Sequence, residues 1–282
     1  MLAGMSTRPT TVPNREEPSG RRRDDACPGA LRLHAADDGA LARVRLPGGL
    51  LDASAARVLA DLAEEFGDGR IDLTSRGNMQ LRALPTNCGA GLASRLRAAG
   101  LLPSDTHERA RNIVATPLAG ARSGVHTVAR EVDRALCADP AAARLSGRFL
   151  FAVDDGRGDA AALDADVTLV APTPPVEPGA ADGAASAVGP WRLALGPDAR
   201  VTVRREDAAR AAVTAALLFL ATGDRFTEAP GTTAPASPEP AAGGRPDRIW
   251  RVTDLPVELL PDTDRLIAAL AGAGISTDPD PE

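Results

Sequence analysis

The stretch Asp72-Leu-Thr-Ser-Arg-Gly-Asn-Met-Gln-Leu-Arg82 decides the fold of this chain. Successive side chains of a β-strand point to opposite faces, so its residues can be sorted with a period of two. Leu73, Met79 and Leu81 then share an apolar face. The opposite face carries two arginines and no acid, which suits an anion such as a carboxylate. The residues of this polar face are Thr74, Arg76, Asn78, Gln80 and Arg82.

A hairpin is the alternative interpretation of the same stretch. A turn at Gly77-Asn78 would place Arg76 beside Met79 and would break up the polar face. The unbroken alternation favours the continuous strand, kinked at Gly77, and this is the structure we expect.

Composition limits the class of protein. With 282 residues the chain has room for about two domains, and 44% hydrophobic residues are enough for a sizeable core. The core must consist mainly of small aliphatic side chains, because the sequence has no tyrosine, two tryptophans and five phenylalanines. A net charge of -6, with arginines spread along the chain, argues against a general nucleic-acid binder.

The sequence also favours a cytoplasmic protein. No apolar run reaches the roughly 18 residues that a membrane-spanning helix needs. The arginines at 21–23 are not followed by an apolar segment, so they do not form a signal peptide. We therefore expect the protein to bind neither a membrane nor a nucleic acid.

The cysteines exclude the common thiolate centres. Cys27, Cys88 and Cys137 lie far apart and form no C-x-x-C pair, so neither a disulfide framework nor a paired-thiolate zinc site is expected. Three thiols also cannot supply the four thiolates of an ordinary iron–sulfur cluster. We expect Cys88 and Cys137 to be buried structural thiols, and no metal ligands are assigned in this chain.

The first half of the chain reads as a compact α+β unit. Strand-like segments precede a helix at 53–66, which Asp52 can cap and whose apolar residues recur at helical spacing. The decisive stretch follows, and then a second amphipathic helix. The remaining expected elements are strands at Leu31–His34 and Leu41–Leu46 and a helix at Gly89–Gly100.

A second α+β unit follows. Arg111-Asn112 stands directly before the apolar run Ile113–Ala115, where the pair either presents hydrogen-bond donors to an anion or is ordinary surface charge. Asp154–Gly158 reads as a tight turn rather than as a metal loop or a pair of catalytic acids. The other expected elements are helices at 127–138, 206–221 and 262–273 and strands at 145–153, 166–171, 191–195 and 200–203.

Several motifs together resemble the nitrite/sulfite reductase superfamily, and within it the precorrin-3B synthase branch of cobalamin biosynthesis. They include the decisive stretch, and the resemblance covers about residues 25–225. The other motifs are Cys27-Pro-Gly with Leu31–His34, Arg43–Gly49, Arg111–Gly120 and Leu145–Gly156.

The resemblance implies an α+β architecture in which a ferredoxin-like half domain precedes a larger sirohaem-domain-like α+β domain. In the family this pair occurs twice, with sirohaem or another iron centre, a [4Fe–4S] cluster and the substrate between the repeats. The implied segments are a disordered tail at 1–24, the half domain at 25–104, the larger domain at 105–225, a linker at 226–248 and an incomplete start of a second repeat at 249–282.

The resemblance also implies roles for individual residues. Arg76 and Arg111 would face anionic groups of a tetrapyrrole, and Arg148 occupies one position of a lysine pair that reductases of the family carry. Leu150 replaces the other lysine, which makes sulfite or nitrite reduction less expected. The implied substrate- and cofactor-binding set is Thr74, Arg76, Asn78, Gln80, Arg82, Arg111, Asn112 and Arg148.

Two functions remain open at this point. The first is an oxidoreductase-family protein of corrinoid synthesis, resembling precorrin-3B synthase, which hydroxylates precorrin-3A and closes a lactone. The second is a non-catalytic half that binds a carboxylated tetrapyrrole or needs a partner chain, because the paired cluster cysteines of the family are missing here. Exposed apolar surface is expected where a second repeat, a partner or another copy would pack.

Overall fold

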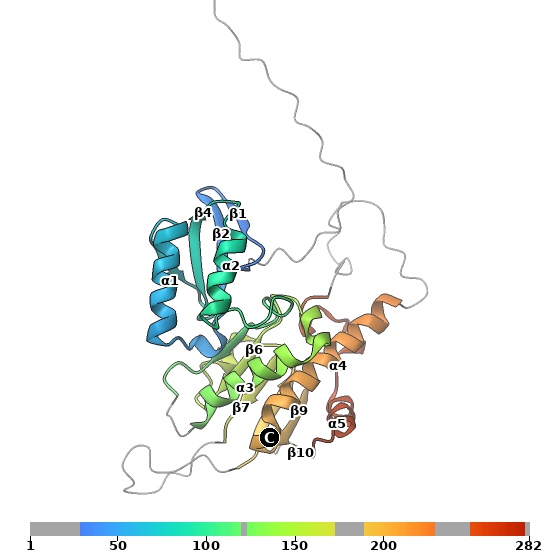
Figure 1. The fold of residues 1–282 in the computed structure, drawn as a ribbon. Helices are drawn as coiled ribbons and strands as arrows, with labels where there is room; N and C mark the ends of the chain where they lie inside the picture. Colours follow the sequence, from blue (N-terminus) through green and yellow to red (C-terminus); the bar gives the residue numbers. More distant parts are fainter. Residues whose placement is uncertain (1–28, 120–122, 173–188, 229–248, 280–282) are drawn as a thin grey trace, which may run out of the picture.

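The computed structural model describes residues 29–119, 123–172, 189–228 and 249–279. They form a mixed α+β protein with two separate sheets, one of four strands and one of six, so the expected fold class is confirmed. Figure 1 shows the smaller unit at the top and the larger one below it. The predicted tail at 1–24, Cys27 and nearly all of the predicted linker at 226–248 lie outside the described residues.

The first sheet is antiparallel, in the order β1-β2-β4-β3. Its strands and helices are β1 (His34–Ala36), β2 (Gly39–Val44), α1 (Ala53–Phe66), β3 (Ile71–Leu73), β4 (Met79–Leu84) and α2 (Gly89–Ala98). Leucines of β4 and of both helices form one core, so the helices cover one face of the sheet. Helix α1 has the predicted bounds, and Asp52 caps it by accepting a hydrogen bond of 2.8 Å from Ala55 N.

The predicted continuous strand is wrong. The chain forms a hairpin, as in the alternative, but the turn spans residues 74–78 rather than Gly77-Asn78, so Arg76 lies in the turn and not beside Met79. Strands β3 and β4 pair antiparallel, with Leu73 opposite Met79, and the residues 74–78 between them form a turn. Two hydrogen bonds link Thr74 and Asn78, from Thr74 N to the Asn78 carbonyl (2.9 Å) and from Asn78 N to Thr74 Oγ1 (3.0 Å). Gly77 takes a left-handed φ of +68°, which glycine adopts without strain. Side-chain and backbone bonds of the turn therefore replace the strand ladder.

The second sheet has the order β10-β9-β8-β7-β6-β5. Strands β5, β6 and β7 are parallel, and the remaining pairs are antiparallel. The strands are β5 (Ile113–Ala115), β6 (Phe151–Asp154), β7 (Val167–Val170), β8 (Trp191–Leu195), β9 (Ala199–Val203) and β10 (Thr277–Pro279).

Helices α3 (Val125–Ala138), α4 (Ala208–Glu228) and α5 (Thr263–Gly272) pack against this sheet. Together with the inward-facing strand residues they enclose the largest core of the described chain, around Phe151, Leu169 and Trp191. Short 3₁₀ helices connect the elements: η1 (Pro47–Gly49), η3 (Pro140–Arg144), η4 (Ala161–Leu163), η5 (Arg205–Asp207), η6 (Val252–Asp254) and η7 (Val257–Leu259).

Two predicted strands start later than expected. The segment 145–150 precedes β6 as an irregular turn, in which Phe149 N donates to the Ser146 carbonyl. Strand β1 likewise begins only at His34, because the chain before it bends. In the first case the apolar side chains of Leu145 and Phe149 are buried without a strand, and in the second Leu31 and Leu33 are partly buried against the core of the first unit.

The last described segment packs into the larger unit. Strand β10 pairs with β9, and Val252, Leu266 and Ile275 lie in the same core as Phe151. Residues 249–279 thus complete the second sheet, although the sequence predicted that a second repeat begins here. The domain boundaries themselves stay a prediction. Within the described residues, no helix has the length and apolar character needed to cross a membrane.

Candidate functional site

The two units meet along the segment that follows β2. The Arg45 guanidinium donates to Asn112 Oδ1 over 2.7 Å, which ties this segment to the start of β5. Further along, a Cβ on Gly48 would lie 3.1 Å from Ala129 Cβ and 3.4 Å from Ala115 Cβ. Because Gly48 also has a left-handed φ of +70°, a larger residue would be strained there. Arg45 and Gly48 therefore hold the half domain along the edge of β5.

The turn at 74–78 lies at this junction. A Cβ on Gly77 would come within 3.2 Å of Gly49 Cα. Gly49 follows Gly48, which contacts Ala115, the last residue of β5. The turn is thus close to the carboxyl end of β5, the first of three parallel strands. Ligands of α/β proteins commonly bind beyond the carboxyl ends of parallel strands.

Arg76 is the cation of this turn. Its side chain is half-buried, and no acid or carbonyl of the described residues pairs with its guanidinium. A guanidinium has five N–H donors in a planar fork that matches a carboxylate. Because Gly77 next to it is held against Gly49, Arg76 is available to an anion at a fixed place.

The other members of the predicted polar face do not lie beside Arg76. Asn78 is buried and accepts a hydrogen bond from Leu46 N (3.0 Å), which anchors the turn. Gln80, with its amide group turned so that the oxygen faces Arg43, accepts hydrogen bonds of 2.6 and 3.1 Å from that guanidinium. Arg82 forms a two-pronged ion pair with Asp38 (2.9 and 3.1 Å), and this hydrogen bonding holds the pKa of the Asp38 carboxyl below its ordinary value. These side chains are engaged within the half domain.

The Arg111-Asn112 pair is buried and internally bonded. Arg111 grips Asp133 of α3 through two hydrogen bonds of 2.6 and 2.9 Å and donates a third to the Leu101 carbonyl. Asn112 accepts from Arg45 and donates to the Phe149 carbonyl over 3.1 Å. The contacts of Arg111 do not support the expectation that it faces an anionic ligand, since its buried guanidinium already makes three hydrogen bonds to protein groups.

Arg148 lies apart from the turn. It precedes β6, so it is at the amino end of the parallel strands, whereas the turn is near the carboxyl end. Its guanidinium carbon is 6.0 Å from the centroid of the Trp250 ring, at the limit of a cation–π contact. Leu150, at the position of the family's second lysine, is completely buried against Val114 and Ala152. The predicted residues therefore do not converge on one site.

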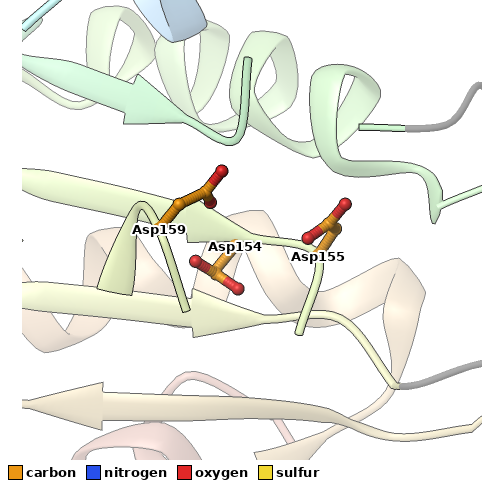
Figure 2. Close-up of side chains that lie close together, drawn as sticks. All are labelled: Asp154, Asp155 and Asp159. Carbon is orange, nitrogen blue, oxygen red and sulfur yellow. The ribbon is translucent and has the colours of Figure 1, made fainter. Parts of the chain in front are cut away.

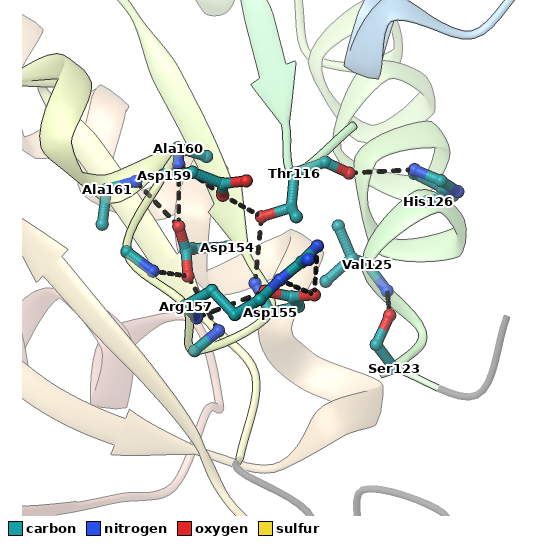
Figure 3. Close-up of polar contacts among 12 residues, drawn as sticks. Thr116, Ser123, Val125, His126, Asp154, Asp155, Arg157, Asp159, Ala160 and Ala161 are labelled. Carbon is teal, nitrogen blue, oxygen red and sulfur yellow. Dashed lines mark hydrogen bonds and ion pairs between the residues drawn. The ribbon is translucent and has the colours of Figure 1, made fainter. Parts of the chain in front are cut away.

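The loop after β6 is a hydrogen-bonded turn, as predicted from Asp154–Gly158. The Asp154 carboxylate is buried and accepts four backbone N–H groups at 2.7–2.9 Å, as Figure 3 shows. Burial raises the pKa of this carboxyl, but the four hydrogen bonds outweigh burial and leave the pKa below its ordinary value. The donors are Gly156, Gly158, Ala160 and Ala161.

Three acids of this loop gather in a way that resembles a metal site. Oxygens of Asp154, Asp155 and Asp159 lie within 4.8 Å of one another (Figure 2). Each carboxylate already has protein partners, however: Asp155 pairs with Arg157 at 3.0 Å, and Asp159 accepts from the Thr116 hydroxyl at 2.7 Å. The geometry fits a structural turn better than a cation site.

Sequence reasoning missed the role of Thr116. Its hydroxyl donates to Asp159 and accepts from Asp155 N (3.2 Å), while its carbonyl accepts from His126 Nε2 of α3 (3.2 Å; Figure 3). The carboxyl ends of β5 and β6 are thereby tied to the first turns of α3. A polar residue directly after the apolar run Ile113–Ala115 was the available signal.

The described residues do not supply ligands for a cluster. Cys88 is buried and Cys137 half-buried, and burial raises the pKa of both thiols, which opposes thiolate formation. Among the described residues, neither belongs to a group of side chains that could share a metal ion. The family's [4Fe–4S] cluster therefore does not fit the residues described here.

Comparisons with known proteins agree with the motifs. Residues 34–99 match the nitrite/sulfite reductase ferredoxin-like half domain. These residues are a half domain of the nitrite/sulfite reductase superfamily. The resemblance that the motifs predicted is confirmed for the superfamily, and the matched segment contains β1 to α2, including the turn that carries Arg76.

The similar proteins include reductases and a synthase. The ferredoxin–nitrite reductase of Synechococcus elongatus is 31% identical over 149 residues, which is 49% of this chain and 29% of that protein. The ferredoxin–nitrite reductase of Leptolyngbya laminosa is 38% identical over 80 residues, 28% of this chain and 16% of that protein. The precorrin-3B synthase of a Sinorhizobium species is 31% identical over 154 residues, 53% of this chain and 33% of that protein.

The chain spans a third or less of the length of these relatives. Among solved structures, that of the Mycobacterium tuberculosis NirA protein is similar, with a TM-score of 0.49 and 21% identity over 62% of this chain and 33% of that chain.

Proposed function

We propose that this protein is a precorrin-3B synthase-like member of the oxidoreductase family, acting in cobalamin biosynthesis, and that it contributes the binding of a carboxylated tetrapyrrole. The observation that carries the proposal is the turn at 74–78, which holds the Arg76 guanidinium at the junction of the two units without an acid partner among the described residues. The similarity to a precorrin-3B synthase supports the choice of tetrapyrrole class.

Arg76 would bind one acetate or propionate group of the substrate. Its planar fork accepts a carboxylate with two parallel hydrogen bonds. The turn is kept in place by the Thr74–Asn78 hydrogen bonds and by the contact of Gly77 with Gly49, so little ordering is needed when the ligand binds. The carboxyl ends of β5 and β6, fixed by Thr116, form the neighbouring surface.

Leu150 favours the synthase interpretation over reduction of nitrite or sulfite. This side chain is completely buried in an apolar cluster with Val114 and Ala152. A second cation beside Arg148 is therefore missing from the place where reductases of the family carry a lysine pair. A small oxyanion would be bound more weakly without it.

Electrons for an oxidation would have to come from outside this chain. A [4Fe–4S] cluster needs four thiolates, and the sequence has three cysteines. Among the described residues, no histidine or cysteine belongs to a group of side chains that could hold a metal ion. We therefore assign this chain a binding and positioning role and derive no redox step from its residues.

A split enzyme that needs a partner chain is the second candidate function. Leu73 and Leu118, which are 74% and 84% exposed, stand directly before the turn and just after Thr116. Exposed leucines close to the proposed site are suited to contact with another protein surface. Anaerobic cluster reconstitution separates the candidates: a full [4Fe–4S] cluster on the chain alone would support an independent enzyme, and colourless protein that still binds a tetrapyrrole would support the split form.

Titration with uroporphyrin III, a carboxylated tetrapyrrole, tests the proposed function. Binding is followed through quenching of the two tryptophans, since the chain has no tyrosine to interfere. Arg76→Ala is expected to weaken binding about tenfold or more, because a charge-assisted hydrogen bond contributes about 1.5–3 kcal/mol.

Arg70→Ala is the matched control. Arg70 is an exposed arginine at the start of β3 whose guanidinium has no partner among the described residues. Its removal changes net charge equally but should leave uroporphyrin III affinity within about twofold. An equal loss of uroporphyrin III affinity in both variants would mean that net charge, and not a contact of Arg76, determines binding. An unchanged affinity in Arg76→Ala would refute the assigned site.

A further inference from the structure

A cleft of about 340 Å³ opens on the second sheet, on the face away from the large core. Its floor comes from β7 and β8, where Thr168, Val170 and Ala194 alternate with the core residues Leu169 and Leu193. Its walls are the chain from Ala161 to Asp166, the turn after β8 and the 3₁₀ helix η6.

Two arginines share this face of the sheet. In the strand register Val170 is opposite Arg192, and Ala194 is opposite Arg200. Arg192 and Arg200 are therefore diagonal neighbours across an antiparallel pair, with Cα atoms roughly 7–8 Å apart. Both line the cleft, and both are exposed to solvent.

Neither arginine is neutralised by an acid of the described residues. The Arg192 guanidinium has no hydrogen-bond or ion-pair partner there, and the Arg200 guanidinium donates only to the Pro197 carbonyl of its own turn, at 3.2 Å. The acids of the cleft lining are Asp164 and Asp166, and both pair with Arg251 instead. Asp166 is also fully buried and accepts from two backbone N–H groups, so it is not available to Arg192 or Arg200.

The two cations share one concave site. Some exposed arginines elsewhere in the described chain pair with an acid, as in Arg95 with Glu65, Arg97 with Asp105 and Arg144 with Asp224, whereas these two do not. Two adjacent cations without acids in a concave site raise the local concentration of anions. The hydroxyls of Thr168 and Thr253, which also line the cleft, can add hydrogen bonds to an oxyanion.

We infer that the cleft between Arg192 and Arg200 binds a small oxyanionic metabolite, either a polycarboxylate or a phosphate ester, with an apolar body against Val170 and Ala194. The site is separate from the turn at 74–78, because that turn lies against Gly49 near the edge strand β5, and β7 to β9 are two to four strands away from β5. The inference consequently does not rest on the proposed tetrapyrrole function.

Calorimetric titration of the full chain with citrate and, separately, with inorganic phosphate at low salt tests the inference. The double variant Arg192→Ala/Arg200→Ala should weaken binding at least about tenfold, since each charged hydrogen bond lost has an effect of that size. Arg265→Ala is the matched control, because Arg265 is an exposed arginine of α5 outside the cleft, with no partner among the described residues. It should leave affinity within about twofold.

The two anions distinguish the two ligand sources. Tighter citrate binding would indicate a polycarboxylate, and tighter phosphate binding would indicate a phosphate ester, provided that the double variant abolishes it. Circular dichroism should show the double variant folded, since both side chains are exposed and neither pairs with an acid of the described residues. Absence of binding to either anion, or equal loss in Arg265→Ala, would overturn the inference.

Discussion

Arg76 and Arg111 lie in the two motifs that the sequence pointed to, but their surroundings differ. Arg76 projects from a turn and has no acid partner in the described part of the chain. Arg111 is 4% exposed and is held by both oxygens of Asp133. The first is available for a ligand, and the second supports the packing of α3 on β5.

The difference shows that a cation in a family motif need not face the ligand. Asp133, which decides the role of Arg111, is 22 residues further along the chain on α3. No local pattern around Arg111-Asn112 reveals that partner. By contrast, the turn around Arg76 contains no acid, and the neighbouring acids Asp38 and Asp72 are both near Arg82.

Replacement of Arg111 is expected to change the stability of the protein more than replacement of Arg76. Arg111→Ala should lower the free energy of unfolding by about 3–5 kcal/mol, because it leaves the Asp133 carboxylate only partly solvated and without its cation. Urea unfolding followed by circular dichroism measures the change. The double variant with Asp133→Ala should recover part of the loss, and a loss below about 1 kcal/mol in Arg111→Ala would contradict the structural role.

Asp154, like Arg111, is a buried charged residue whose hydrogen bonds are all to protein groups. Asp154→Asn should lower the free energy of unfolding by roughly 2–3 kcal/mol at neutral pH, because an amide cannot accept all four backbone N–H groups. The folded-state pKa of Asp154 is lowered, so its contribution is complete above the ordinary aspartate pKa and is lost as pH falls through the folded-state pKa.

The difference in the free energy of unfolding between wild type and Asp154→Asn should therefore become smaller at acid pH. Unfolding curves at neutral pH and at successively lower pH values measure this. Added Mg²⁺ or Ca²⁺ serves as the contrasting test, since the turn interpretation expects no effect on the melting temperature of either protein. A cation-dependent stabilisation of the wild type alone would assign Asp154, Asp155 and Asp159 to a metal site instead.

Local signals in the sequence were sufficient for some elements and insufficient for others. Helix α1 was predicted with its observed bounds, because the Asp52 cap and the spacing of Leu59 and Leu62 are both local. The hairpin was misread because the period-two pattern continues through Gly77, while the bonds of the turn involve side chains of Thr74 and Asn78. The side chain of Asn78 is polar, as in a binding-site residue, but it accepts a hydrogen bond from Leu46 N of the same half domain.

Long-range pairing explains the remaining errors. Nothing near Thr277 shows that β10 joins β9, and nothing near Thr116 shows that its hydroxyl reaches Asp159, 43 residues away. The cleft between Arg192 and Arg200 likewise depends on the register of β8 and β9. Such contacts follow from the assembled sheet, whereas the half-domain motif was recognisable from the chain itself.

Arg76→Ala has the smallest expected effect on folding and is the counterpart of Arg111→Ala. Its free energy of unfolding should stay within about 0.5 kcal/mol of wild type, as for a surface change that removes no buried contact. Thr74→Ala at the other end of the turn should cost about 1 kcal/mol, since Asn78 N loses its side-chain acceptor. Urea unfolding of both variants measures these two changes in the free energy of unfolding. If Arg76→Ala destabilised the protein as much as Thr74→Ala does, Arg76 would be part of the turn's own framework, and its weaker uroporphyrin III binding would reflect a displaced turn rather than a lost contact.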